Sequence, residues 1–459
     1  MPAKMSVYNI GKAGVNVDAN PVQLQDGELT EAQNWTTDPA GSEGGLRKRP
    51  GLTAINASAG GGGTSVLGAI NLAYTFTLTN TFYVGIRAGA QNGATPTQTW
   101  RTSTNGTTWG SVTTPTRPFY GDLRSLTTWS DEKVMISFKN RIFYAGDDYI
   151  NYPTAGHSAP TIHMWDGTND VIVGYMPYNI AAGATTNSFG VQAMAPLDND
   201  HFLIAVDDGA SVPVTGNGRV MKFNPTTGQF TQIGPTAAVG AVEFNGMIPT
   251  CLAVYGNQVW LGTENYGTGA AKIFRIHPDQ DTTWTTDTTF GATFNVHSLA
   301  VYKGELYAGM RTLLGGNPSI YKRDTVGAWT ASLATGTSSS GFSVFSSLVV
   351  FGENLYALCH DDGVVDVSER VTIRKFDGTT WTTVWTIETD VGESATQTRV
   401  GNGIVGPDGA LYFVVAEYDA AGATAATSDG IVMRSTNGTT WVLVDTFTNM
   451  RGAIGFTRT

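Results

Sequence analysis

A repeated alternation of apolar and polar positions runs along most of the chain. Each copy has an apolar segment, a polar turn of two to four residues and a second apolar segment that ends in small residues. The copies span 67–85, 134–146, 194–206, 252–262, 299–309, 348–358 and 404–414. Their turns contain pairs such as Lys-Gly, Gly-Asn and Asp-Gly, which adopt positive φ readily. Because the flanking Val, Ile, Leu and Tyr favour strands, each copy predicts a β-hairpin.

A second, more polar hairpin follows most of these copies. Its first strand alternates apolar and polar residues, which predicts one buried face, as in 272–276, 319–323, 371–376 and 431–435. A turn and an aromatic residue come next, at Trp109, Phe230, Trp284, Trp329, Trp381 and Trp441. We expect this aromatic residue to open the last strand of the unit and to pack between neighbouring sheets.

One unit therefore has four strands in about 50 residues, which is a period typical of β-propeller blades. A single sheet of this size cannot bury both faces, whereas equal sheets around an axis cover one another. The units begin near Val66, Asp122, Val191, Pro249, Val296, Ser346 and Gly401. The sequence thus predicts an all-β fold, a seven-bladed β-propeller over 61–459, with six or eight blades as alternatives. We expect the strand that closes the ring at 451–456 or at 51–55.

Composition narrows the functional classes. The 459 residues include 56 Gly, only 14% are charged, and the net charge is −11. Clustered Lys and Arg that neutralise phosphates are not expected in such a chain, which argues against general nucleic-acid binding. Cys251 and Cys359 lie far apart and are expected to be buried thiols. No secretion signal and no apolar run of roughly 18 residues is present, so we expect synthesis in the cytoplasm and no membrane anchor.

Residues 1–60 follow a different pattern and predict an extended N-terminal arm with a linker. Asp26-Gly27 indicates a turn, and Asp26 is placed to cap a short helix through Asn34. Residues 46–50 predict a basic strand closed by a Pro-Gly turn, and 58–64 predict a flexible Gly-rich linker.

This arm resembles the N-terminal segment of bacteriophage virion proteins that join such an arm to a β-propeller. The nearest group is the tail nozzle, or tail tubular protein B, of short-tailed phages. The shared pattern is filled here by Gly14, Asn16, Pro21, Leu24, Asp26, Gly27, Glu28, Leu29, Ala32, Asn34, Asp38, Arg49 and Gly51. The propeller itself matches that group only as an architecture.

The resemblance implies a structural protein of the virion tail, assembled in the cytoplasm of the bacterial host. Copies of the chain, six if the ring is the hexamer of that group, would surround the channel through which genomic DNA leaves, without sequence-specific contacts. The other partners would be the tail adaptor or portal-proximal tail proteins and tail fibres. An arm that crosses to a neighbouring subunit gains affinity by covering a large surface.

A set of polar, basic and apolar positions in the arm is assigned to the interface between subunits. These residues are Asn16, Pro21, Leu24, Asp26, Glu28, Leu29, Asn34, Arg47, Lys48 and Arg49. The basic residues at 47–49 have two interpretations: they are a solvated strand end, or they form salt bridges to an acidic neighbour.

No catalytic constellation is recognisable in the sequence. The segments 103–109 and 435–441 resemble the Asp-box of sialidases, a structural hairpin, and each is one residue shorter than that box. Asp361, Asp362 and Asp366 are interpreted as a solvated loop, with calcium binding as the alternative. The six histidines, which never pair at a zinc-type spacing, are His157, His163, His201, His277, His297 and His360. The prediction is a protein without enzymatic activity, cofactor or metal.

Two other functions are alternatives to the structural one and rank below it. In the first, the chain is a receptor-binding or glycan-binding tail module, whose exposed Trp and Tyr side chains stack on sugars. In the second, which ranks last, it is a glycan-cleaving enzyme, a class that needs two carboxylates facing one bond.

Overall fold

The computed structural model contains strands, turns and bends, and no helix, among the residues that it describes. Those residues are 14–15, 28–29, 35–37, 46–48, 80–88, 97–113, 135–148, 159–165, 169–175, 190–207, 219–234, 247–265, 270–291, 294–312, 319–334, 343–361, 371–386, 397–418, 429–448 and 451–458. Within them, no helix is long and apolar enough to cross a membrane. The chain divides into two units, Met1–Leu78 and Thr79–Thr459. The all-β prediction is confirmed.

The first unit contains two small strand pairs. β1 (Gly14–Val15) pairs in parallel with β2 (Glu28–Leu29), and β3 (Trp35–Thr37) pairs antiparallel with β4 (Leu46–Lys48). β4 confirms the basic strand predicted at this place. The prediction of a short helix that begins at Asp26 is wrong at Glu28–Leu29. The backbone there forms the strand β2 and pairs with β1, so it is not helical.

The second unit is built from antiparallel four-stranded sheets, which we call blades. Blade 1 comprises β32 (Arg451–Arg458), β5 (Asn80–Ala88), β6 (Thr97–Ser103) and β7 (Gly110–Thr113). Blade 2 comprises β8 (Met135–Phe138), β9 (Arg141–Asp148), β10 (Ala159–Trp165) and β11 (Asp170–Tyr175). Blade 3 comprises β12 (Gly190–Pro196), β13 (Phe202–Asp207), β14 (Arg219–Asn224) and β15 (Gln229–Gln232). Blade 4 comprises β16 (Met247–Tyr255), β17 (Gln258–Asn265), β18 (Lys272–Ile276) and β19 (Thr285–Thr289).

The remaining blades continue the same order. Blade 5 comprises β20 (Phe294–Tyr302), β21 (Glu305–Thr312), β22 (Ser319–Arg323) and β23 (Trp329–Ala334). Blade 6 comprises β24 (Ser343–Phe351), β25 (Asn354–Asp361), β26 (Val371–Phe376) and β27 (Trp381–Thr386). Blade 7 comprises β28 (Gln397–Val405), β29 (Leu411–Tyr418), β30 (Asp429–Ser435) and β31 (Val442–Thr448). Blades 5 and 6 are joined into one sheet where β21 also pairs with β24.

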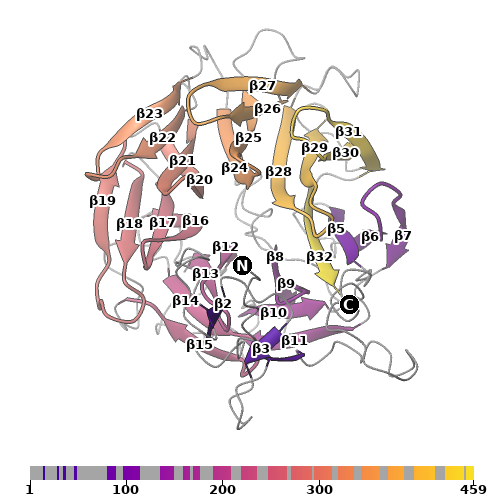
Figure 1. Ribbon diagram of the computed structural model, residues 1–459, viewed down its shortest axis with the longest axis horizontal. Helices are drawn as coiled ribbons and strands as arrows, with labels where there is room; N and C mark the ends of the chain where they lie inside the picture. The colour runs from indigo at the N-terminus through magenta and orange to yellow at the C-terminus, as the bar shows by residue number, and fades with distance from the viewer. Residues whose placement is uncertain are drawn as a thin grey trace, which may run out of the picture. The chain divides into compact units, whose positions relative to one another are not determined.

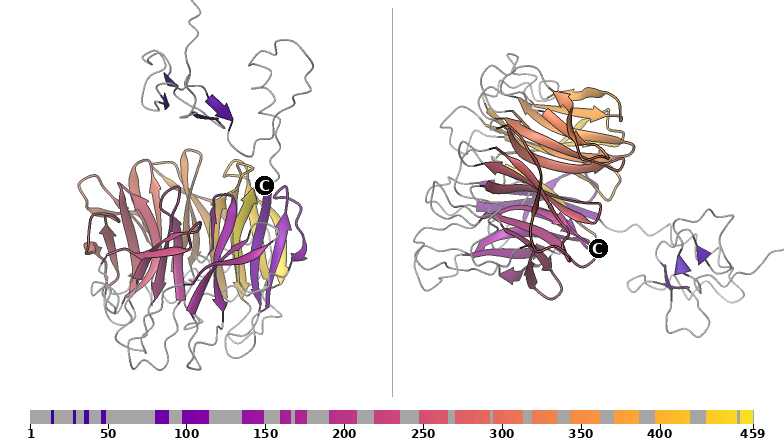
Figure 2. Two further views of the ribbon diagram at one scale, coloured as in Figure 1. Left: turned by 90° about the horizontal axis from the view of Figure 1, so that it is seen from below. Right: turned by 90° about the vertical axis from the view of Figure 1, so that its left-hand side faces the viewer.

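The blades follow one another around a central axis, so the second unit is a β-propeller (Figure 1). Seen from the side, the strands run through the thickness of this ring (Figure 2). Five of the predicted unit starts lie inside the first strand of a blade, namely β12, β16, β20, β24 and β28. The start predicted near Asp122 lies outside the described residues, and blade 2 begins at Met135.

The C-terminal strand closes the ring. β32 pairs with β5 residue by residue from Arg451↔Arg87 to Arg458↔Asn80, and β6 pairs with the other edge of β5. The first of the two predicted closing segments is therefore the one used. The hairpin predicted at 67–85 is wrong, because both edges of β5 are already occupied and the partner strand comes from the other end of the chain.

Apolar side chains fill the space between successive blades. Six clusters of buried residues each combine side chains from two neighbouring blades, from the junction of blades 2 and 3 to the junction of blades 7 and 1. Between blades 3 and 4, for example, Leu203 and Val220 meet Leu261 and Phe274, all fully buried. Each sheet thus buries its faces against its neighbours, which is the reason that such small sheets are stable together.

The aromatic residues predicted to lie between sheets do so. Trp284, Trp329 and Trp381 each direct the indole N–H into the preceding blade. The acceptors are the Ile233 carbonyl at 3.4 Å, Asp287 Oδ2 at 2.8 Å and Ser332 Oγ at 3.1 Å, respectively. Trp441 packs on Tyr356 of blade 6, with ring centroids 6.5 Å apart.

Candidate functional site

The residues assigned from sequence to an inter-subunit interface fall into two groups. Asn16, Pro21, Leu24, Asp26, Asn34 and Arg49 lie outside the described residues. Glu28 and Leu29 form β2, and Arg47 and Lys48 lie in β4, where the backbone pairing is described. The interface assigned to these positions stays a prediction.

The wall around the central axis has a repeated irregularity. The innermost strands of blades 3 to 7 each carry a bulge at the equivalent place in the pairing. The residues that bulge include a polar side chain in every case: Gln192, Thr250, His297, Ser346 and, in a two-residue bulge with Gly401, Asn402. A bulge bends the strand and re-aims its side chains.

Hydrogen bonds at this level join the inner strands to one another. The hydroxyl of Thr250 donates to the Val296 carbonyl of blade 5. The hydroxyl of Ser298 donates to the Phe345 carbonyl of blade 6 at 2.8 Å. Blades 6 and 7 are joined by the Gly403 N–H of blade 7, which donates to Ser347 Oγ of blade 6 at 3.0 Å. The three bonds link blades 4 to 7 in sequence around the axis.

A cavity of about 140 Å³ is lined by the innermost strands of blades 3 to 7. It is lined by Ala193, Met194, Cys251, Leu252, Ser298, Leu299, Ser346, Ser347, Leu348 and Asn402. Its lining is uncharged and mixes leucine and methionine with small polar side chains. The volume is below the roughly 300 Å³ at which ordinary ligand pockets begin.

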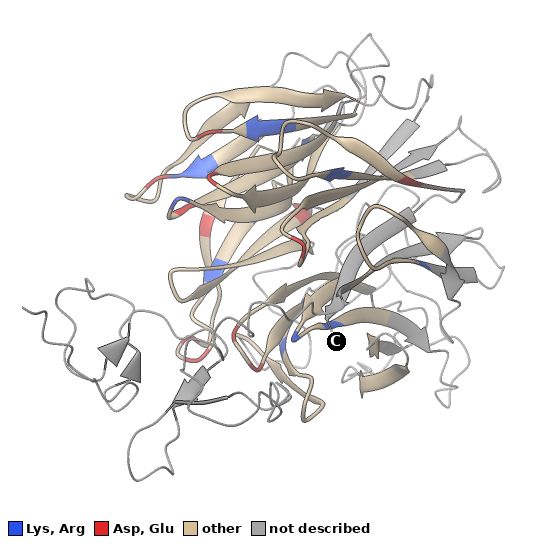
Figure 3. Cartoon of the chain, turned by 45° about the vertical axis from the view of Figure 1, so that its right-hand side comes forward, with Lys and Arg blue, Asp and Glu red and all other residues tan. Residues whose placement is uncertain are grey.

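In contrast to the uncharged cavity, one end of the propeller carries charged residues. We call this end the turn face, because it holds the tight turns at 139–140, 198–200, 256–257, 303–304, 352–353 and 407–409. Charged residues of both signs are scattered over the strands and turns of the propeller (Figure 3). On the turn face, Lys139 of blade 2 reaches Asp200 of blade 3 at 2.8 Å, and Lys222 of blade 3 reaches Asp279 of blade 4 at 2.9 Å. Both aspartates are exposed to solvent, so these ion pairs add little stability.

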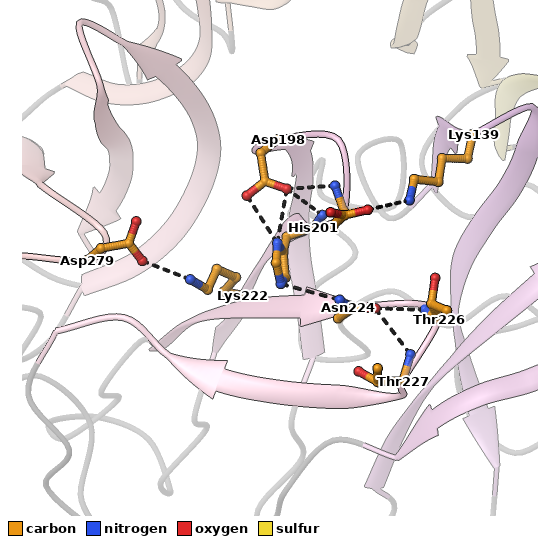
Figure 4. Close-up of polar contacts among 9 residues, drawn as sticks. Lys139, Asp198, His201, Lys222, Asn224, Thr226, Thr227 and Asp279 are labelled. Atoms are coloured by element: carbon orange, nitrogen blue, oxygen red, sulfur yellow. Dashed lines mark hydrogen bonds and ion pairs between the residues drawn. The ribbon is translucent and has the colours of Figure 1, made fainter. Parts of the chain in front are cut away.

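A polar cluster lies between those two ion pairs, within blade 3 (Figure 4). The carboxylate of Asp198 accepts the N–H groups of Asp200 at 2.7 Å and of His201 at 2.8 Å. The imidazole Nδ1 of His201 lies 3.0 Å from each carboxylate oxygen of Asp198. On its other side, His201 Nε2 lies 3.4 Å from the side-chain nitrogen of Asn224. Carboxylate, imidazole and amide thus form one chain across two turns.

Sequence reasoning missed this cluster, because it tested the histidines only for zinc-type spacing. The local signal is the Asp-x-x-His spacing inside the first turn of the third unit. Among the described residues, no group of three or more His, Cys, Asp or Glu side chains is arranged to hold a metal ion. Asp361 ends β25, while Asp362 and Asp366 lie outside the described residues. Cys251 and Cys359 are buried thiols, as predicted.

A buried carboxylate ties blade 4 to blade 5. Asp287, with 5% of its side chain exposed, accepts hydrogen bonds from Arg323 Nε at 3.0 Å, Arg323 Nη2 at 3.1 Å and Trp329 Nε1 at 2.8 Å. Arg275 Nε forms a second ion pair with it at 3.1 Å. The guanidinium of Arg323 also stacks 4.9 Å from the ring centre of Trp260.

Asp287→Asn is expected to lower the free energy of unfolding by about 2 kcal/mol. The amide keeps the size of the side chain but leaves two guanidinium groups without an anion. Urea denaturation of the variant beside Asp279→Asn tests this, because Asp279 is 65% exposed in its own ion pair and should cost no more than about 0.5 kcal/mol. Equal losses in the two variants would contradict the role given to Asp287.

The two Asp-box-like segments are turns whose polar side chains bond locally. Asn437 Oδ1 accepts the N–H groups of Thr439 at 2.9 Å and Thr440 at 2.8 Å, and Ser435 Oγ accepts the Gly438 N–H at 2.8 Å. The turn at 103–108 repeats the same bonds around Asn105. Their interpretation as structural hairpins is confirmed.

Comparison with known proteins gives a likeness of fold. No family model and no curated protein matches the chain. A solved protein from Lactobacillus plantarum is 13% identical, with a TM-score of 0.49, over 82% of this chain and 99% of that one. A protein from Bacteroides uniformis, provisionally named a 6-phosphogluconolactonase, is 12% identical, with a TM-score of 0.48 over 82% and 99%. The sialidase of Trypanosoma rangeli is 11% identical, with a TM-score of 0.43, and the match covers 76% of this chain and 56% of that enzyme.

These comparisons correct one prediction. The sequence predicts a protein without enzymatic activity, whereas the named structures similar to it are a lactonase by its provisional name, a sialidase and an arabinofuranosidase from Fusarium graminearum. The expectation of no activity is therefore contradicted. Identities of 11–12% for these enzymes concern the fold, so no substrate and no catalytic residue is carried over. The similar structures show that the chain has a fold of the β-propeller type.

Proposed function

We propose that this chain is a structural component of a bacteriophage tail, a ring-forming nozzle or tail tube protein around the DNA exit channel. In this proposal the propeller is the body of each subunit, and the N-terminal unit docks one copy to the next. The observation that carries it is the origin of the closing strand. The propeller takes that strand from its own C-terminus, as β32 on β5.

Among the strands that the structure describes, those of the N-terminal unit pair with one another and none completes a propeller sheet. Both edges of β5 are occupied by β32 and β6, and blade 1 is complete with four strands. The N-terminal unit holds the pattern that resembles the arm of phage tail proteins, including the positions from Gly14 to Gly51. A separate unit with its own strand pairs and basic strand suits docking on another molecule better than ring closure.

In this proposal DNA passes along an axis shared by several copies, outside the axis of any one propeller. The net charge of −11 suits such a passage, because an acidic wall repels the phosphate backbone and does not hold it.

Deletion of residues 1–60 tests the division of labour. We expect the full chain to sediment as an oligomer and to form rings in negative-stain micrographs. The truncated chain is expected to sediment as a monomer, with a melting temperature within a few degrees of the full chain. A triple Arg47→Gln, Lys48→Gln, Arg49→Gln variant tests the role of the basic trio. If these residues form salt bridges to a neighbouring subunit, the rings should weaken; if they are a solvated strand end, the rings should persist.

Two results would overturn the proposal. The first is a full chain and a truncated chain with the same oligomeric state. The second is immunogold label on peripheral tail tips, and not on the tail axis, in phage particles that carry the chain. Label on peripheral tips together with saturable binding on a glycan array would favour a receptor-binding module instead.

A further inference from the structure

We propose that Asp198, His201 and Asn224 form an acid-sensitive link between the two turns of blade 3. The link joins the β12–β13 turn, which carries Asp198 and His201, to the β14–β15 turn, which Asn224 opens (Figure 4). Protonation of the imidazole breaks the contact with Asn224 and loosens the second turn. The inference is independent of the function proposed above.

The orientation of the Asn224 amide is fixed by the backbone. Its Oδ1 accepts the N–H groups of Thr226 at 2.9 Å and of Thr227 at 3.1 Å. Only the oxygen of the amide can accept these two bonds, so the NH₂ group must face the other way, toward His201. An NH₂ group there requires an acceptor, and His201 Nε2 lies 3.4 Å away.

The amide in turn fixes the tautomer of the histidine. Because Nε2 accepts from Asn224, the ring proton must lie on Nδ1, where it is donated to the carboxylate of Asp198 at 3.0 Å. The neutral ring thus satisfies both neighbours. A second proton on Nε2 would place an N–H directly against the NH₂ of Asn224, and a flip of that amide would cost both backbone hydrogen bonds.

The surrounding charges decide which contact gives way. Burial acts to raise the pKa of Asp198, but the N–H of Asp200, the imidazole of His201 and the N–H of His201 together hold that pKa below its usual value. Asp198 therefore stays a carboxylate at mildly acidic pH and binds the protonated ring more strongly, since charge-assisted hydrogen bonds exceed neutral ones. The other charged groups at the cluster are Lys139, paired with Asp200, and Lys222, paired with Asp279. The contact that yields is the one to Asn224.

Each turn keeps its own backbone bonds when the link breaks. The N–H groups of Leu197 and Asp198 still donate to the His201 carbonyl, and the Gly228 N–H still donates to the Asn224 carbonyl at 2.8 Å. What changes is the anchor of the Asn224 amide on His201, which holds in place the oxygen that caps Thr226 and Thr227. Acid therefore loosens one turn locally, and the blade stays folded.

Hydrogen exchange measured by mass spectrometry on the full chain at pH 5.5 and 7.5 tests the link, after correction for intrinsic exchange rates. We expect protection of the turn at 225–228 to fall about five- to tenfold at the lower pH. The turn around Asn437 is the internal control, because its oxygen caps Thr439 and Thr440 in the same way and its amide nitrogen donates to Thr440 Oγ1 and not to a histidine. Protection there should not change with pH.

Two variants separate the link from a general effect of acid. His201→Gln removes the imidazole, so the pH dependence at 225–228 should disappear. Asn224→Asp keeps an oxygen on both backbone N–H groups and offers a second oxygen to a protonated ring, so acid should no longer reduce protection. Equal protection of wild-type protein at both pH values would overturn the proposal, and so would a pH dependence that survives in either variant.

Discussion

Deletion of residues 451–459 is expected to abolish the cooperative unfolding transition of the propeller. Without β32, the inner edge of β5 loses a ladder that runs from Arg87 to Asn80. Each lost backbone bond costs about 1 kcal/mol net, and a domain of ordinary stability has only about 5–15 kcal/mol in total. The junction of blades 7 and 1 also loses the strand that lies beside β28. The loss is therefore comparable to the whole free energy of unfolding.

Thermal denaturation followed by circular dichroism checks this expectation, with the 1–60 deletion as the matched truncation at the other end. A synthetic peptide of residues 451–459 added to the truncated protein should restore part of the transition, because the β5 edge is then filled again. Asp445→Asn is a milder test of the same junction. Asp445 accepts from Arg101 of blade 1, with Nη2–Oδ1 at 2.6 Å, and its loss should cost about 1–2 kcal/mol. A C-terminal truncation that melts like the full chain would contradict the role given to β32.

The sequence predicts the blades well where a hairpin is local. In blades 4 to 6 the first two strands are separated by turns of two residues, such as Gly256-Asn257 and Lys303-Gly304. Both turns have positive φ, which their Gly and Asn residues favour. Alternation of apolar and polar residues then fixes which face is buried. The aromatic residues at the fourth strands are predictable for the same reason, since they recur after each second turn.

Contacts that depend on distant parts of the chain are not predictable in this way. The pairing of β32 with β5 joins opposite ends of the propeller segment, and the sequence alone leaves two candidates for that strand. Apolar residues at 67–85 imitate the local pattern and so predict a hairpin that does not form. The ion pair of Arg101 with Asp445 and the cluster around Asp287 have no signal in sequence spacing. They arise only because the ring brings different blades together.

The His201 cluster is an intermediate case. Its three members lie within one unit, and Asp198 and His201 are three positions apart. A search for metal or catalytic spacing passes over them, because one histidine beside one aspartate is common. What gives the pair a defined chemistry is Asn224, whose amide orientation depends on the next turn and is visible only in three dimensions.

Gly438→Ala is expected to cost at least about 3 kcal/mol of unfolding free energy. Gly438 lies in the turn before Trp441 with φ of 71°, where a Cβ is strained by about 1 kcal/mol. A Cβ at this position would also overlap the hydroxyl oxygen and Cζ of Tyr356. Tyr356 is fully buried between blades 6 and 7, so it has no free space in which to move. The same contact recurs one junction on, where Gly106 meets Tyr412.

Chemical denaturation of Gly438→Ala beside Gly409→Ala separates the two causes of this loss. Gly409 has φ of 74°, and a Cβ added there would meet nothing within 4 Å, so its substitution should show the backbone strain alone, about 1 kcal/mol. A cycle with Tyr356→Leu then isolates the clash, because removing the ring should make Gly438→Ala less costly by about 1–2 kcal/mol. Equal costs at the two glycines, or a cycle without coupling, would show that the turn of blade 7 does not lock onto Tyr356. If the coupling is found, the Asp-box-like turn of blade 7 packs against blade 6, and that of blade 1 packs against blade 7. The two turns then stabilise both junctions of blade 7, the blade that precedes the closing strand β32.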